Sequence, residues 1–142
     1  MKKTDVAYLA GIVDGEGCIM INRFATDRSK IGYQYRVIVE ITMCDYKTIK
    51  HIAEVFDRPI EKRTLKSEKI AYKVIWRNGP AADLLKILMP YLKGKREQAV
   101  ECLNFHKFTP GRGREYKQTD YEVLEKFRLK VKWLKCAEAL RC

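Results

Sequence analysis

The sequence lacks the features by which membrane proteins, disulfide-rich proteins and zinc proteins are usually recognised. Its longest apolar runs, such as residues 6–10, are far shorter than the ~20 residues that a membrane-spanning helix needs. The five cysteines are an odd number without a Cys-x-x-Cys pair, and there are only two histidines. This pattern is typical of free thiols in a reducing, intracellular compartment, such as the prokaryotic cytoplasm or an organelle. We therefore expect no membrane partner, no disulfide framework and no zinc site.

Acidic residues are scarce relative to basic ones. The 142 residues include 29 Lys and Arg but only 18 Asp and Glu, which gives a formal net charge of +11. Such an excess favours a polyanionic partner. Because no helical pattern has a clean basic face for a membrane surface, nucleic acid is the leading interpretation. The length suits one domain and no shift in composition marks a boundary, so residues 1–142 are expected to form a single domain.

The hydrophobic periodicity predicts an α+β fold. Apolar residues at three- and four-residue spacing predict helices, the first of them capped by Asp5, and alternating residues predict strands. The expected order is helix 5–16, strands 18–26 and 33–44, helix 47–56, strands 60–66 and 70–77, a helix from Pro80 that Pro90 interrupts, helix 94–107, and a long last helix capped by Thr119 or Asp120. This order predicts a four-stranded antiparallel sheet with helices packed against it.

The end of the first helix has an unusual composition. Ala7, Gly11 and Gly15 follow one another at four-residue spacing, so one face of the helix carries almost no side chains. A glycine inside a helix costs about 1 kcal/mol relative to alanine, and close approach of a second helix would compensate for it. The alternative is a surface helix weakened by glycine. If two copies pack along this stripe, two Glu16 carboxylates meet at a helix end where the macrodipole disfavours anions, which favours protonation or capture of a metal ion.

Residues 9–17, LAGIVDGEG, resemble the signature of the LAGLIDADG homing endonuclease family. They match seven of its nine positions when Gly15 and Glu16 are accepted as variants. The expected element order also resembles the family's αββαββα fold, followed here by further helices. The single motif resembles the short homodimeric members rather than the long two-motif monomers. The resemblance implies a double-strand DNA endonuclease of intron homing that cleaves a long, nearly palindromic target, with Ala7, Gly11 and Gly15 in the dimer interface.

The resemblance also implies a metal site. The acidic residue of the motif, which binds a divalent metal at the dimer axis, corresponds to Glu16, and the neighbouring carbonyl ligand belongs to Gly15. The cofactor implied is Mg²⁺. Mn²⁺ is expected to substitute for it, and Ca²⁺ is expected to support DNA binding without cleavage.

Further catalytic positions follow from the same resemblance. A basic residue near the scissile phosphates corresponds to Lys95, with Lys93 as the competing position; in a chain this rich in lysine, a solvated side chain is the alternative. Asp45 corresponds to a polar residue after the second strand. It is either a third catalytic group or the N-cap of the next helix. For Asp14, fixing the end of the first helix is the expected role.

The resemblance implies that the sheet forms a concave saddle over the major groove, which is wide enough for β-ribbons. Because side chains alternate along a strand, those on one face of the sheet are expected to pack against the helices and those on the other face to contact DNA. The residues expected to contact DNA are Asn22, Phe24, Thr26, Arg28, Arg36, Ile38, Glu40, Thr42, Glu61, Arg63 and Lys73 in and beside the strands, and Arg112 and Arg114 in a basic glycine-rich loop. A solvated sheet face is the alternative, although apolar side chains on the same surface argue against it.

Two other functions fit the same fold. One is an RNA maturase that binds its host intron RNA, and the other is a DNA-binding regulator without nuclease activity. Glu16 argues against the inactive regulator, because a non-catalytic protein has no need for a carboxylate in so unfavourable a field. The sequence does not exclude a maturase activity.

Overall fold

The computed structural model describes residues 1–109 and 116–140, and it has the predicted α+β architecture. Its elements are α1 (Lys3–Glu16), β1 (Gly17–Ala25), β2 (Tyr33–Met43), α2 (Tyr46–Val55), β3 (Glu61–Thr64), β4 (Ile70–Arg77), α3 (Gly79–Leu88), α4 (Arg96–Phe108) and α5 (Gln118–Leu140). Each element corresponds to a predicted one. The boundaries differ by a few residues, most at β3, which is shorter than the predicted strand 60–66.

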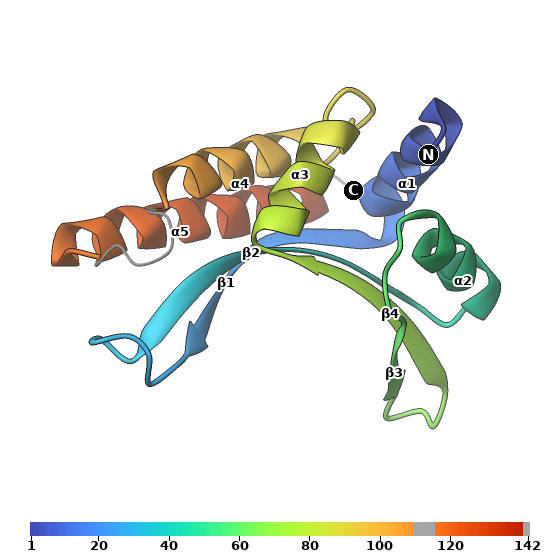
Figure 1. The fold of residues 1–142 in the computed structure, drawn as a ribbon, viewed down its shortest axis with the longest axis horizontal. Coiled ribbons are helices and arrows are strands. Elements are labelled where there is room, and N and C mark those ends of the chain that lie inside the picture. The colour runs from blue at the N-terminus through green and yellow to red at the C-terminus, as the bar shows by residue number, and fades with distance from the viewer. Residues whose placement is uncertain (110–115, 141–142) are drawn as a thin grey trace.

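The four strands form one antiparallel sheet in the order β1-β2-β4-β3. The helices lie on one face of this sheet, and the sheet curves away from them so that its other face is concave (Figure 1). The strand β1 is at one edge and β3 at the other. The concave face is therefore the surface on which the predicted DNA-contacting residues can be compared with the structure.

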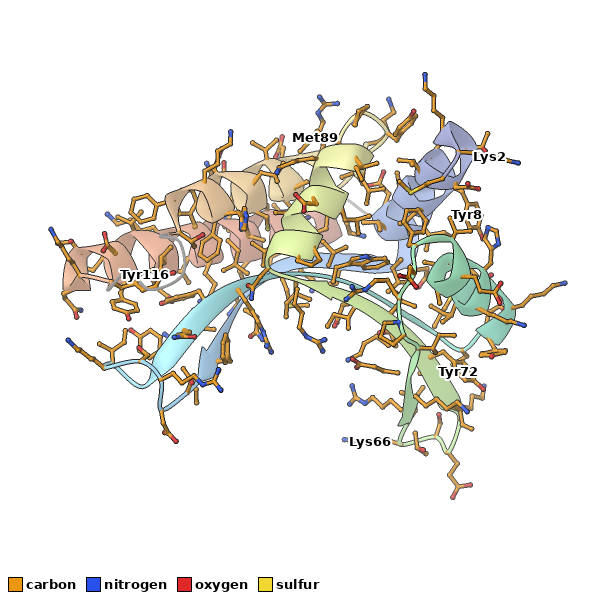
Figure 2. The ribbon with its side chains drawn as sticks, in the orientation of Figure 1. Lys2, Tyr8, Lys66, Tyr72, Met89 and Tyr116 are labelled. Atoms are coloured by element: carbon orange, nitrogen blue, oxygen red, sulfur yellow. The ribbon has the colours of Figure 1, made fainter. Side chains whose placement is uncertain are left out.

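The core lies between the sheet and the helices. Alternation predicts an inward-facing set on the strands, and most of it is buried there, namely Ile19, Ile21, Val37, Val39, Ile41, Val74 and Trp76. Tyr72, the remaining member of that set, is partly buried against the core. The buried members pack with buried helix residues such as Leu9, Val13, Leu85 and Leu88. Side chains fill this layer and also project from the concave side, and Lys66 marks the outer turn of the β3–β4 hairpin (Figure 2). The predicted alternation of the strands is thus confirmed.

The starts of α1 and α5 differ from the prediction. Helix α5 begins at Gln118, so Thr119 and Asp120 lie inside its first turn instead of capping it. Helix α1 begins at Lys3 with Lys2 as its N-cap, so Asp5 lies inside the first turn instead of capping the helix. The Asp5 carboxylate accepts a hydrogen bond from the backbone N–H of Lys2 at 2.9 Å. A carboxylate at the third helical position can reach back to the N-cap in this way, so an acidic residue near a helix start does not by itself identify the first residue.

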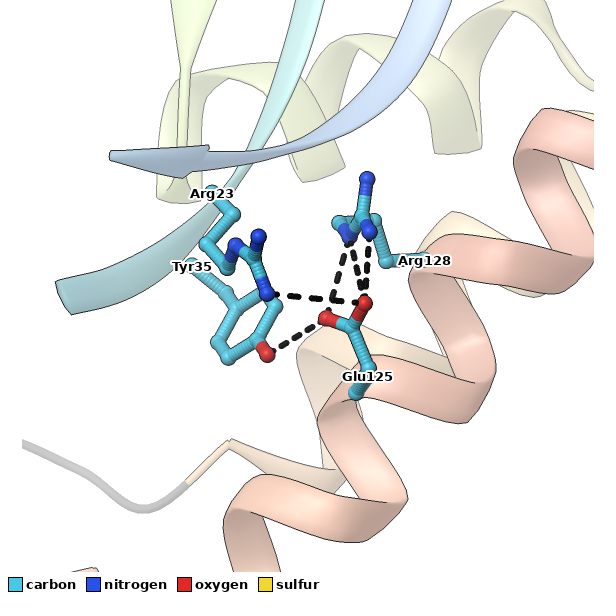
Figure 3. A network of polar contacts seen from close by, with 4 residues as sticks. All are labelled: Arg23, Tyr35, Glu125 and Arg128. Carbon is cyan, nitrogen blue, oxygen red and sulfur yellow. Dashed lines mark hydrogen bonds and ion pairs between the residues drawn. The ribbon is translucent and has the colours of Figure 1, made fainter. Parts of the chain in front are cut away.

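Helix α5 is attached to the first two strands by a polar network around Glu125 (Figure 3). The Glu125 carboxylate accepts hydrogen bonds from the Arg128 guanidinium and from the Tyr35 hydroxyl, and Arg23 of β1 lies 3.7 Å away. The hydrogen bonds from Arg128 lower the pKa of Glu125, and burial raises the pKa of Tyr35. This network fixes α5 alongside the edge strand β1.

Two observations concern the composition. The described cysteines, Cys18, Cys44, Cys102 and Cys136, are free thiols. Among the helices of residues 1–109 and 116–140, none is long and apolar enough to cross a membrane.

Candidate metal centre and nucleic-acid interface

The last turn of α1 leads directly into β1, and Gly17 makes this connection possible. A Cβ atom at Gly17 would lie 2.7 Å from the Cα of Val13 and 2.9 Å from its carbonyl oxygen, so a larger residue would collide with the helix backbone. The Gly17 N–H caps the helix by donating to the carbonyls of Ile12 and Val13. The helix therefore ends at Glu16, whose side chain is exposed.

Asp14 holds the loop before α4 against the end of α1. Its two carboxylate oxygens accept hydrogen bonds from the backbone N–H groups of Lys93 and Lys95, at 2.8 and 2.9 Å. These groups are about eighty residues apart in sequence, so Asp14 connects distant parts of the chain. This is the structural role that the sequence indicated for Asp14.

The ammonium group of Lys95 also lies at the end of α1. It donates to the carbonyl oxygens of Val13 at 2.9 Å and Asp14 at 2.7 Å. A cation at a helix C-terminus compensates for its unpaired carbonyls and its negative dipole end. Lys95 therefore sits within one turn of Glu16, whereas the Lys93 side chain is exposed.

The end of α1 offers two of the oxygen ligands that a divalent cation would need. The Glu16 carboxylate is exposed, and the Gly15 carbonyl belongs to the last turn of the helix, directly after the two carbonyls that Lys95 binds. Carboxylate and carbonyl oxygens are the ligands of Mg²⁺ and Ca²⁺. Within the described part of one chain, however, no group of three or more His, Cys, Asp or Glu residues could hold a metal ion. The described residues of one chain thus offer an incomplete set of side-chain ligands.

The small-residue face of α1 is open in the single chain. Ala7, Gly11 and Gly15 are exposed, and a Cβ atom built on either glycine meets nothing within 4 Å. Val6, Leu9, Ala10 and Val13 bury the opposite face in the core. The face of α1 formed by Val6, Leu9, Ala10 and Val13 is therefore packed in the core. The small-residue face is open, and it runs along the helix to Glu16 at its last position.

Asp45 has the geometry of a helix cap. It is the N-cap of α2, where one carboxylate oxygen accepts the Lys47 backbone N–H at 3.1 Å and the other accepts the Thr48 hydroxyl at 2.5 Å. The hydrogen bond from Thr48 is the main reason that the pKa of Asp45 is lowered. Of the two roles considered for Asp45, these contacts favour the cap.

The concave face carries a stacked pair at the outer half of β1 and β2. The Arg36 guanidinium lies over the Phe24 ring, 4.4 Å from its centroid, and Asn22 is directly opposite Arg36 in the sheet. Such stacking restrains the guanidinium. The Arg36 Nε is buried and has no hydrogen-bond partner in the described chain. The stacking therefore holds the Arg36 guanidinium beside the Asn22 amide on the concave face.

A second polar cluster lies at the other end of the concave face. Glu61 of β3 forms ion pairs with Lys73 at 3.2 Å and with Arg77 at 3.3 Å, both from β4. The hydrogen bond from Lys73 is the largest cause of the lowered pKa of Glu61. Two cations thus surround the carboxylate. Arg77 was absent from the predicted set, although its alternation with Lys73 along β4 could have identified it.

The remaining predicted DNA contacts differ in accessibility. Ile38 lies on the concave face but is only 4% exposed, so it contributes little surface in the free chain. Glu40 and Thr42 lie on the same face, and Arg63 is exposed on β3. Thr26 and Arg28 belong to the turn after β1, where the Thr26 hydroxyl accepts the Arg28 backbone N–H. Arg112 and Arg114 lie outside the described residues.

The sequence matches the family model described as LAGLIDADG endonuclease over residues 9–110, well over half of the chain. No curated protein matches it.

Several solved structures have the same fold. The homing endonuclease I-CvuI, in complex with a DNA target, is 23% identical with a TM-score of 0.77, over 93% of this chain and 82% of that chain. The archaeal intron-encoded homing endonuclease I-Vdi141I, complexed with DNA, is 13% identical with a TM-score of 0.77, over 94% and 86%. The homing endonuclease I-TnaI is 18% identical with a TM-score of 0.68, over 95% and 94%.

Proposed function

The chain belongs to the LAGLIDADG endonuclease family, as residues 9–17 predicted, and we propose that it cleaves double-stranded DNA at a specific site as a metal-dependent homodimer. The observation that carries this proposal is the open face of α1. Ala7, Gly11 and Gly15 form an exposed stripe that leads to Glu16, and the described residues of one chain bring no three His, Cys, Asp or Glu side chains together as a metal site. A second copy packed along the same stripe would cover it and bring a second Glu16 to the site.

In this proposal, Glu16 and the Gly15 carbonyl would hold the metal, with ligands from the second subunit. Bound there, Mg²⁺ would supply the activation of water and the stabilisation of the leaving oxygen that phosphodiester hydrolysis needs. Lys95 stabilises the end of α1 and supplies positive charge close to the scissile phosphate. Asp14 keeps Lys95 in this position by binding the backbone of its loop.

The concave faces of two subunits would read the DNA. A homodimer presents the same residues twice, so its target should be nearly palindromic. Arg36, held over Phe24, suits the O6 and N7 atoms of guanine, and Asn22 suits adenine. The comparison structures support DNA as the partner, since I-CvuI and I-Vdi141I are each described in complex with DNA.

The proposal is tested with Glu16→Gln, which keeps the size of the side chain and removes its charge. We expect the variant to remain a dimer and to bind DNA as tightly as the wild type or slightly more tightly, because repulsion between the two carboxylates disappears. Single-turnover cleavage in Mg²⁺ should fall by several orders of magnitude. The measurements are sedimentation, a binding titration in Ca²⁺ and the cleavage rate on one duplex, which is selected from a randomised library with the wild type.

The matched control is Glu122→Gln, the same chemical change at an exposed position of α5. It should leave dimerisation, binding and cleavage unchanged. Cleavage by Glu16→Gln within about tenfold of the wild-type rate would place the metal elsewhere. A wild-type protein that binds duplex DNA but cleaves nothing with Mg²⁺ or Mn²⁺ would instead be a regulator, and one that binds only intron RNA would be a maturase.

A further inference from the structure

A lysine of the C-terminal helix reaches the concave face beside the end of α1. Helix α5 runs along α4 (Figure 1), and it also contacts β1, the strand that follows α1. There the Lys135 ammonium lies 3.1 Å from the thiol sulfur of Cys18. Cys18 is the second residue of β1 and comes two residues after Glu16. The last helix thus brings a positive charge close to the proposed metal ligand.

The register of the sheet shows on which face this contact lies. Cys18 pairs with Glu40, and Glu40 pairs with Ile75, so these three residues form one row across the sheet. Ile19, the next residue of β1, is buried in the core on the helix side. Since successive side chains of a strand point to opposite faces, the row of Cys18 belongs to the concave face. Because β1 is an edge strand, Lys135 can extend past it to that face.

The surroundings of Lys135 keep it charged and leave it able to bind a ligand. The hydrogen bond with the Cys18 sulfur is the main cause that raises the pKa of Lys135, and the Glu40 carboxylate adds to the effect. An ammonium group has three donors, and a thiol is a weak acceptor. Lys95, by comparison, already donates to two carbonyl oxygens. Lys135 therefore has more hydrogen-bonding capacity left for an anion on this face.

We propose that Lys135 binds a phosphodiester group of the DNA backbone where it passes the start of β1, so that α5 forms part of the DNA-binding surface. The inference rests on the proposed endonuclease function. Phosphate contacts of this kind fix the register of a protein on a duplex without reading its bases. Here the contact would hold the DNA backbone beside Cys18, which comes two residues after Glu16 in the sequence. Cys18 acts as a positioning residue for the ammonium.

The test compares Lys135→Ala with Lys126→Ala, an equal loss of charge at an exposed position of the same helix. The affinity of each dimer for the selected duplex is measured in Ca²⁺ over a range of salt concentrations. Lys135→Ala should weaken binding on the order of tenfold or more and reduce the slope of log affinity against log salt by about 2, one phosphate per subunit. Lys126→Ala should change affinity less than about twofold and leave the slope unchanged. Equal effects of the two substitutions would overturn the inference.

Cys18→Ala separates phosphate binding from a purely structural contact between α5 and β1. If Lys135 binds phosphate, this variant keeps the charge, so its affinity should fall less than about threefold and its salt slope should match the wild type. If the Lys135–Cys18 contact only holds the helix in place, Cys18→Ala should weaken binding as much as Lys135→Ala, which would overturn the inference. A wild-type protein that binds no DNA would overturn the proposed function as well, so the two failures are distinguishable.

Discussion

Asp45 illustrates how a single side chain can be assigned to structure or to chemistry. Both of its oxygens are engaged at the start of α2, by Lys47 and Thr48. Serine is as good an N-cap as aspartate, whereas alanine is not. We therefore expect Asp45→Ala to lower the thermal unfolding midpoint and Asp45→Ser to restore most of the loss, with both variants cleaving DNA at close to the wild-type rate. A loss of cleavage of about a hundredfold in both variants, without a change in unfolding, would instead assign Asp45 to the reaction.

Glu125 should make stability depend on pH. Arg128, Tyr35 and Arg23 stabilise its ionised form, and the hydrogen bonds from Arg128 contribute most to its lowered pKa. A carboxylate whose pKa is lower in the folded state contributes its stability above its unfolded pKa, about 4.3 for glutamate, and loses it as the pH falls through the folded pKa. We expect Glu125→Gln to reduce the free energy of unfolding by about 2 kcal/mol at pH 7.

The difference between Glu125→Gln and the wild type should shrink as the pH falls below about 4.3. Urea unfolding at pH 7 and at a series of lower pH values measures this difference, and other carboxylates cancel because both proteins contain them. Glu122→Gln, on the same helix but exposed, should show no such trend. A difference that stays constant with pH would mean that Glu125 contributes through packing and not through its charge.

Among the elements, local patterns predicted most of the fold. Alternation along β2 and β4 and the apolar periodicity of α1 identified the elements and their buried faces, because each element must bury one face against the others. The contacts of α5 were beyond prediction. The periodicity of α5 does not indicate that Glu125 accepts a hydrogen bond from Tyr35 or that Lys135 contacts Cys18. These pairs are 90 and 117 residues apart in sequence.

The site was predicted unevenly for the same reason. A nine-residue motif located Glu16 and the end of α1, because that stretch is continuous in sequence. The hydrogen bonds that the Asp14 carboxylate accepts from the backbone of Lys93 and Lys95 depend on a loop that only folding brings to the end of α1. Arg77 is different, because strand alternation already places it on the same face as Lys73. Its position on the concave face could therefore be predicted, although its ion pair with Glu61 could not.

The two glycines of the α1–β1 region should respond in opposite ways to a single methyl group. Gly17→Ala introduces a Cβ atom 2.7 Å from the Val13 Cα, so the helix end or the strand must move, at a cost of about 1–3 kcal/mol or more. Gly11→Ala meets nothing within 4 Å in one chain and gains about 1 kcal/mol of helix propensity.

Gly11→Ala should nevertheless weaken the proposed dimer, because the close approach of two helices leaves no room for the methyl groups. The measurements are urea unfolding at a dilution where the wild type is monomeric and sedimentation over a range of protein concentrations. A more stable monomer with a weaker dimer is the expected result for Gly11→Ala. An unchanged dissociation constant would show that the chains associate through another surface.

At the scale of the whole molecule, charge and symmetry act together. A dimer carries twice the formal charge of +11, and two concave faces meet one duplex. Neutralising a phosphate releases counterions, so binding weakens as salt increases, whereas a contact with a base edge contributes specificity. The basic side chains of this protein should therefore fall into two groups, although each carries one positive charge. Replacing one group should change the salt dependence of binding, and replacing the other should change sequence specificity.

Salt dependence and specificity should respond separately in Arg36→Ala. If the wild-type dimer neutralises roughly ten phosphates, the slope of log affinity against log salt is about −9. Arg36 is held over the Phe24 ring on the concave face, which suits a base edge. Arg36→Ala should relax preference at one symmetric pair of base positions and change the slope by less than about 1. Selection from a randomised library and a salt titration measure the two effects. If the substitution instead lowers affinity equally for all sequences and the slope falls by about 2, Arg36 binds the backbone, and sequence reading must come from the other side chains of the concave face.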